Sequence, residues 1–103
     1  MKSYQILPAE QRIVVLPDEK EERRTSMGII LPQTSEEDRP ETGVIVAVGK
    51  GDIDNPMKYL VGQRVIFSQY AGLSIRINFD KYGEHIYKVM NQADIIGQIK
   101  EIN

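Results

Sequence analysis

The chain has 103 residues, a formal net charge of −2 and no cysteine. This length predicts one domain, residues 1–103, and the lack of cysteine excludes disulfides and thiolate chemistry and fits a cytoplasmic location. The near-neutral charge gives no basic surface for nucleic acid, and without a long apolar run we expect neither a signal peptide nor a membrane-spanning helix.

Six short segments are predicted to be β-strands, because each is β-branched or alternately apolar and is bounded by turn signals. In chain order they are RIVVL (12–16), GVIVAVG (43–49), RVIF (64–67), LSIRINFD (73–80), HIYKVM (85–90) and IIGQIKEI (95–102). The fourth segment alternates strictly, so Leu73, Ile75, Ile77 and Phe79 share one face. No window keeps a helical period for three turns. The sequence therefore predicts an all-β fold, a small barrel rather than an open sheet with exposed edges.

The segment between the first two strands, about residues 17–42, is predicted to be a long mobile loop. It holds eight of the 15 acidic residues of the chain and lacks the apolar surface that would offset the entropy of ordering. An aliphatic triplet, Ile29, Ile30 and Leu31, nevertheless lies inside it between Gly28 and Pro32. The triplet is either a strand of the core or a surface that binds another protein.

A second excursion, about residues 50–60, is predicted to be a short hairpin because it contains the turn signal Asp54-Asn55-Pro56. The spacing of Asp52 and Asp54 is weakly similar to that of a calcium loop. However, Pro56 occupies the third ligand position, and the glycine and final acid of such loops are missing. We therefore predict no metal site.

Catalytic chemistry has few candidate groups in this sequence. His85 is the only histidine, and it opens an amphipathic strand with no nucleophile nearby in the sequence. Serine and threonine lie mostly in the charged loop, where a nucleophile would not be held in a fixed geometry. No catalytic residue is predicted, and the chain is not expected to be an enzyme.

Several motifs follow one another in a recognisable order: RIVVLPDE, MGIILP, GVIVAVGKG, VGQRVIF, YAG and ADIIGQI. Together they resemble the GroES family of co-chaperonins, the lids of GroEL-type chaperonins, over about residues 6–99. The most specific parts are GIIL at 28–31, the glycine-spaced stretch at 43–51 and DII at 94–96.

Four departures from the family pattern fit a divergent or phage-encoded member. Met27-Gly28 stands where the family usually has two glycines, and Gln11-Arg12 where it usually has Asp-Arg. The excursion at 52–58 is shorter than in bacterial relatives, and the stretch 72–94 is a few residues longer.

The resemblance implies a role for each candidate site. The docking triplet, Ile29, Ile30 and Leu31, would bind a GroEL-type chaperonin, with Gly28 as a flexible joint. The chain ends, through Ile6, Leu7, Ile96 and Ile99, would join the protomers into a homo-oligomeric ring, a heptamer in the family. Asp52 and Asp54 would meet their copies at the roof opening, unless the excursion is an ordinary solvated turn.

The family function would be to close an ATP-driven folding chamber over unfolded proteins. ATP would belong to the chaperonin, so no cofactor is expected on this chain. The alternative is a small β-barrel that binds nucleic acid or the ribosome. The acidic loop and the lack of clustered basic and aromatic residues disfavour it.

Overall fold

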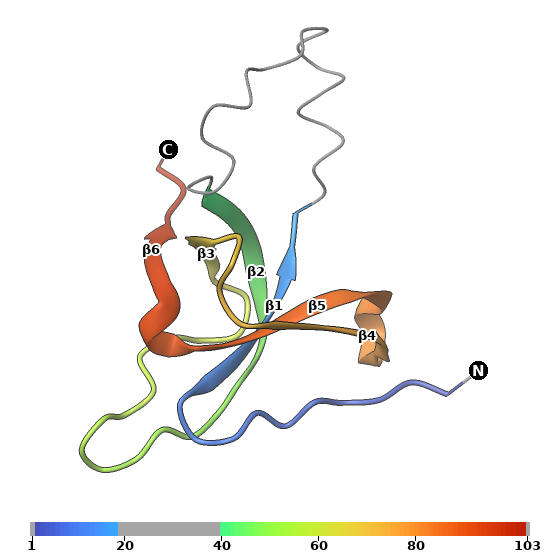
Figure 1. Cartoon of the computed structure of the whole chain (residues 1–103), viewed down its shortest axis with the longest axis horizontal. Coiled ribbons are helices and arrows are strands. Elements are labelled where there is room, and N and C mark those ends of the chain that lie inside the picture. Colours follow the sequence, from blue (N-terminus) through green and yellow to red (C-terminus); the bar gives the residue numbers. More distant parts are fainter. Residues whose placement is uncertain (1, 19–39, 103) are drawn as a thin grey trace, which may run out of the picture.

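The computed structural model describes residues 2–18 and 40–102, whose strands form one six-stranded antiparallel sheet (Figure 1). Its strands are β1 (Arg12–Pro17), β2 (Pro40–Val48), β3 (Arg64–Ser68), β4 (Leu73–Phe79), β5 (Gly83–Asn91) and β6 (Ile95–Ile99). Two short 3₁₀ helices, Asp80–Tyr82 and Gln92–Asp94, precede β5 and β6. The strand order is β4-β5-β1-β2-β3-β6. The prediction of an all-β fold with six strands is confirmed.

The start of β2 and the end of β6 differ from the sequence prediction, because pairing with a neighbouring strand sets them. β2 begins at Pro40, three residues before the predicted start, because residues 40–44 pair with β3. β6 ends at Ile99 rather than at residue 102, because Ile99 pairs with Arg64, the first residue of β3, and the ladder has no partner beyond it. Pairing, rather than local sequence, thus sets these boundaries.

Both faces of the central strand β1 are covered, so Ile13, Val14 and Val15 are all fully buried. The two core clusters lie on opposite sides of it. One contains Ile13, Val15, Ile45, Val65, Phe67 and Met90, and the other contains Val14, Val46, Phe79 and Tyr87. A register shift between Val14 and Val15 in the pairing with β2 leaves Val46 as the extra residue, so that the adjacent Val46 and Ala47 both pack on the side of the second cluster.

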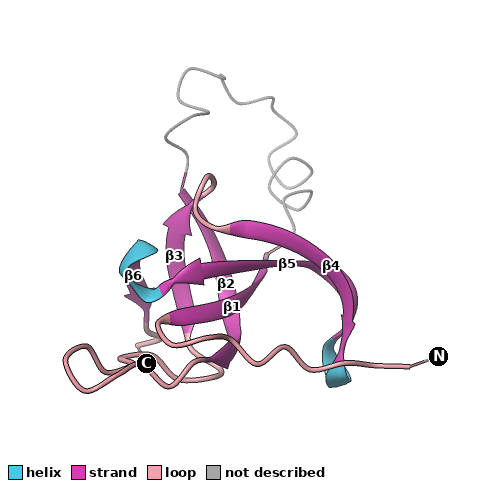
Figure 2. Ribbon diagram, turned by 60° about the horizontal axis from the view of Figure 1, so that its bottom comes forward, coloured by secondary structure: helices cyan, strands magenta, loops and turns pink. Residues whose placement is uncertain are grey.

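The sheet is strongly curved (Figure 2), but its ladder is not closed, because β4 and β6 are its two edges. The N-terminal segment covers only the end of the β4 edge: the Tyr4 amide donates to Asn78 O and the Asp80 amide donates to Tyr4 O, both at 2.8 Å. The outer edge of β6 has no partner strand among the described residues. The barrel expected to hide its edges therefore still exposes the outer edge of β6 and most of that of β4 in the single chain.

The predicted apolar face of β4 is covered only at one end. Phe79 is 3% exposed, whereas Leu73 is 78% exposed. β4 is an edge strand and pairs with β5 alone.

Candidate functional site

The predicted docking residues, Gly28, Ile29, Ile30 and Leu31, lie outside the described residues. The base of their segment is described, where the chain leaves β1 and returns in β2 (Figure 1). Pro17 is paired with Gly43, and the Asp18 amide donates to Thr42 O at 2.9 Å. The two ends of residues 19–39 are therefore anchored on neighbouring strands.

Asp18 is the central side chain of this base. Its carboxylate accepts a hydrogen bond from Thr42 Oγ1 on β2 and forms an ion pair with Arg64 Nη2 on β3. One side chain thus ties the end of β1 to the neighbouring strand β2 and to β3, the next strand beyond it. Sequence reasoning assigned Asp18 to the charged loop and missed this role, because its partners lie 24 and 46 residues away.

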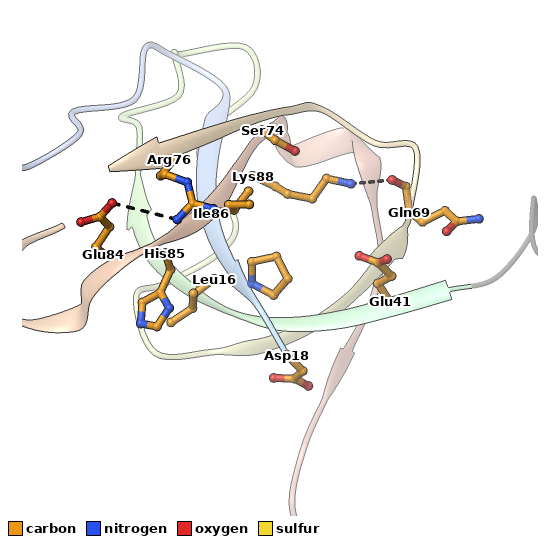
Figure 3. A pocket seen from close by; sticks show the side chains of 11 residues that line it. Leu16, Asp18, Glu41, Gln69, Ser74, Arg76, Glu84, His85, Ile86 and Lys88 are labelled. Carbon is orange, nitrogen blue, oxygen red and sulfur yellow. Dashed lines mark hydrogen bonds and ion pairs between the residues drawn. The ribbon is translucent and has the colours of Figure 1, made fainter. Parts of the chain in front are cut away.

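A groove of about 790 Å³ opens beside this base, between Asp18 and Glu41 on one side and the β4–β5 hairpin on the other (Figure 3). On the hairpin, Lys88 is 8% exposed, donates to Gln69 O at 2.5 Å and lies 5.6 Å from the centre of the Phe67 ring. Arg76 and Glu84 form a long ion pair of 4.0 Å at the rim. The walls of the groove are thus charged and already engaged with one another.

The described residues offer no catalytic arrangement in this groove. His85 is exposed, and its ring contact is with Tyr87, edge-on at 6.0 Å between ring centres. Burial, and secondarily the nearby Tyr82, raise the pKa of the Tyr87 hydroxyl, which donates to Gly83 O at 2.7 Å. Tyr87 is therefore a neutral structural anchor rather than an acid or base.

The four residues predicted to join protomers are placed in two ways. Ile6 is partly buried and packs against the core cluster of its own chain that contains Val14 and Phe79. Leu7, Ile96 and Ile99 are exposed, at 83%, 64% and 39%. The backbone of residues 5–7 makes no hydrogen bond to the described residues, so these residues form no strand within the single chain.

The excursion at 50–60 is a tight turn on an anchored stem. Asp52 and Asp54 are both exposed at its tip, where Asp52 Oδ1 accepts from the Asn55 amide at 2.8 Å. At its base, Met57 and Tyr59 pack against the core. The excursion therefore has a fixed stem and a solvated tip.

Gln92 holds this stem in place, and sequence reasoning missed it. Its side chain is almost completely buried, with 5% of the residue exposed. Its Oε1 accepts from the Lys58 amide at 3.0 Å, and its Nε2 donates to Pro56 O at 3.1 Å and to Gln11 Oε1. Nothing in the local sequence signals this role, because the three partners are far from Gln92 in the chain.

We expect Gln92→Met to destabilise the fold by about 1–3 kcal/mol, because it leaves a part-buried amide and carbonyl of the stem without partners. Urea unfolding would measure the loss, and amide hydrogen exchange at Lys58 should become faster. Gln98→Met is the matched control, since Gln98 is exposed on β6. Unchanged exchange at Lys58 would contradict the anchoring role.

Among the described residues, no three His, Cys, Asp or Glu side chains are grouped so that they could hold a metal ion. No helix in that part of the chain is long and apolar enough to cross a membrane.

Known proteins match this chain over the residues of these sites. The model of the family described as "Chaperonin 10 Kd subunit" matches residues 5–99. The chain belongs to this family. Relatives named co-chaperonin GroES include that of Thermotoga maritima, 36% identical over 93% of this chain and 97% of the relative. Those of Nitrosospira multiformis and Hahella chejuensis are 37% and 40% identical, over 93% and 92% of this chain and 98% and 97% of the relatives.

Membership of the chaperonin 10 family confirms the resemblance inferred from the motifs. The matched range includes the base at Asp18, the excursion, β4 and all of β6. The chain is accordingly a co-chaperonin and not an enzyme.

Proposed function

We propose that this co-chaperonin forms a ring that caps a GroEL-type chaperonin in the cytoplasm and closes its ATP-driven chamber over unfolded proteins. ATP is bound by the partner, and this chain carries no cofactor. The observation that supports the proposal best is the family match over residues 5–99, which spans the docking triplet and the β6 edge together.

Docking is assigned to Ile29, Ile30 and Leu31, with Gly28 as the joint. Burying three aliphatic side chains contributes roughly 5–9 kcal/mol, whereas ordering each residue of the segment costs about 1–2 kcal/mol. One such segment alone therefore binds weakly. Several on one ring bind strongly, because each later docking step is intramolecular.

The ring is assigned to the chain ends and is taken as a heptamer, to match a sevenfold chaperonin. The unpartnered edge of β6 and the unbonded backbone of residues 5–7 support this assignment. An exposed strand edge is a template for pairing with another chain, and a heterologous contact between two different surfaces generates a ring when its rotation closes.

The roof is assigned to the excursion tip, where Asp52 and Asp54 would approach their copies. We expect Asp52→Asn with Asp54→Asn to stabilise the ring at low salt, because carboxylates a few ångströms apart repel by roughly 1 kcal/mol per close pair. The gain should fade as salt rises, since screening shortens the range of the repulsion. Dissociation of the ring on dilution, followed by mass photometry, measures it.

The Asp52→Asn change is a clean probe, because an amide oxygen can still accept from the Asn55 amide and keep the turn. Asp80→Asn, on an exposed residue in the 3₁₀ helix before β5, is the control. Equal dissociation of the double variant and the wild type at low salt would leave the tip an ordinary solvated turn.

A pull-down with a GroEL-type chaperonin, with and without ATP, tests the proposed function. We expect retention that depends on nucleotide and a free ring of about seven protomers by mass. A monomer that ignores the chaperonin under every nucleotide condition would refute the proposal.

A further inference from the structure

We propose that Asp18 is a positioning residue that fixes, through Thr42 and Arg64, the direction in which the chain leaves the sheet toward the docking triplet. The inference rests on the proposed docking function. It adds a residue outside the triplet that controls how well the ring binds.

Hydrogen bonds hold the chain in place directly after the end of β1. The β1–β2 ladder ends at the pair Pro17 and Gly43, and Asp18 follows directly. Its amide donates to Thr42 O at 2.9 Å, and its carboxylate accepts from Thr42 Oγ1 and Arg64 Nη2. Backbone and side chain of Asp18 are therefore both fixed, and by two different strands.

We expect this arrangement to contribute little to overall stability. The Asp18 and Arg64 side chains are 33% and 46% exposed, and ion pairs with this much exposure contribute little to the free energy of unfolding. Neither residue, nor Thr42, belongs to the two core clusters. The interaction holds a strand end at the point where the chain departs, which is where orientation matters for docking.

Multivalent binding turns a small effect of orientation on each segment into a large effect on the affinity of the whole ring. A tether that starts in the wrong direction lowers the effective concentration of each later docking step. A twofold loss per segment compounds to about a hundredfold over a ring of seven. Loss of the Asp18 contacts should therefore appear mainly as faster release of the whole ring.

The test compares ring variants for release from a GroEL-type chaperonin in the presence of ATP, alongside ring mass and thermal midpoint. Asp18→Ala should weaken binding by tenfold or more, while its mass and midpoint stay close to those of the wild type. Asp18→Asn should restore most of the binding, because its amide oxygen can accept from both partners. Thr42→Val, which removes one hydroxyl, should weaken binding in the same direction and gives a second reading should Asp18→Ala fold poorly.

Glu84→Ala is the matched control, since it removes a more exposed ion pair on the β4–β5 hairpin across the groove, with no contact to the end of β1, and should change nothing. Asp18→Ala rings that bind like the wild type would overturn the positioning role and leave the proposed function intact. A lowered thermal midpoint or a dissociated ring in Asp18→Ala and Thr42→Val would also overturn it, since the contacts would then be structural. Wild-type rings that never bind a chaperonin would instead refute the function itself.

Discussion

Replacing Ile29, Ile30 and Leu31 with Ser is expected to abolish binding to the chaperonin and to leave the ring and its fold intact. Each segment would lose nearly all of the roughly 5–9 kcal/mol that the three side chains contribute on burial. Multivalency cannot compensate, because it multiplies contacts that each need some affinity of their own. The described residues meanwhile supply two packed core clusters on either side of β1.

The measurement is a pull-down in ATP, with circular dichroism, thermal midpoint and ring mass on the same samples. Leu73→Ser with Ile75→Ser and Ile86→Ser is the matched control. It removes three aliphatic side chains that are 78%, 41% and 49% exposed on the β4–β5 hairpin, and it should leave binding unchanged. A large drop in the thermal midpoint of the triplet variant would show that the triplet is a strand of the core, which was the other interpretation of the sequence.

The sequence was sufficient to locate the strands, because their signal is local. Alternation and β-branched runs at 12–16, 64–67 and 73–80 match β1, β3 and β4 to within one residue at each end. The ends of β2 and β6 were misplaced, because they depend on how far a neighbouring strand extends. Pro40 and Glu41 read as loop in the sequence, yet they pair with Ser68 and Phe67.

The residues of the candidate site also separate into those with a local sequence signal and those without one. The aliphatic triplet and the apolar chain ends were proposed as sites from their unusual local compositions. Asp18 and Gln92 were not, because their roles arise only when residues 24 to 81 positions apart meet. Gln11 is part of the same contact, since its Oε1 accepts from Gln92 Nε2 at the stem of the excursion.

The second prediction with a large expected effect concerns the assembly of the proposed ring. Deleting residues 97–103 would remove the C-terminal contact, but Gly97, Gln98 and Ile99 also pair with β3 of their own chain. Such a truncation would shorten the sheet as well as the interface. Point changes at exposed positions separate the two effects, and Leu7 and Ile96 are the most exposed of the four predicted interface residues.

We therefore expect Leu7→Asp with Ile96→Asp to convert the ring into folded monomers. In the ring each aspartate would be buried at a subunit contact without a partner, whereas in the monomer both positions face water, so only assembly is penalised. Size-exclusion chromatography with light scattering measures the mass, and circular dichroism confirms the fold. Leu73→Asp, at a 78% exposed position on the opposite edge strand β4, is the control and should leave the ring intact. A double variant that still elutes as a ring would place the subunit contact elsewhere on the sheet, and monomers from the Leu73→Asp control would move it to β4.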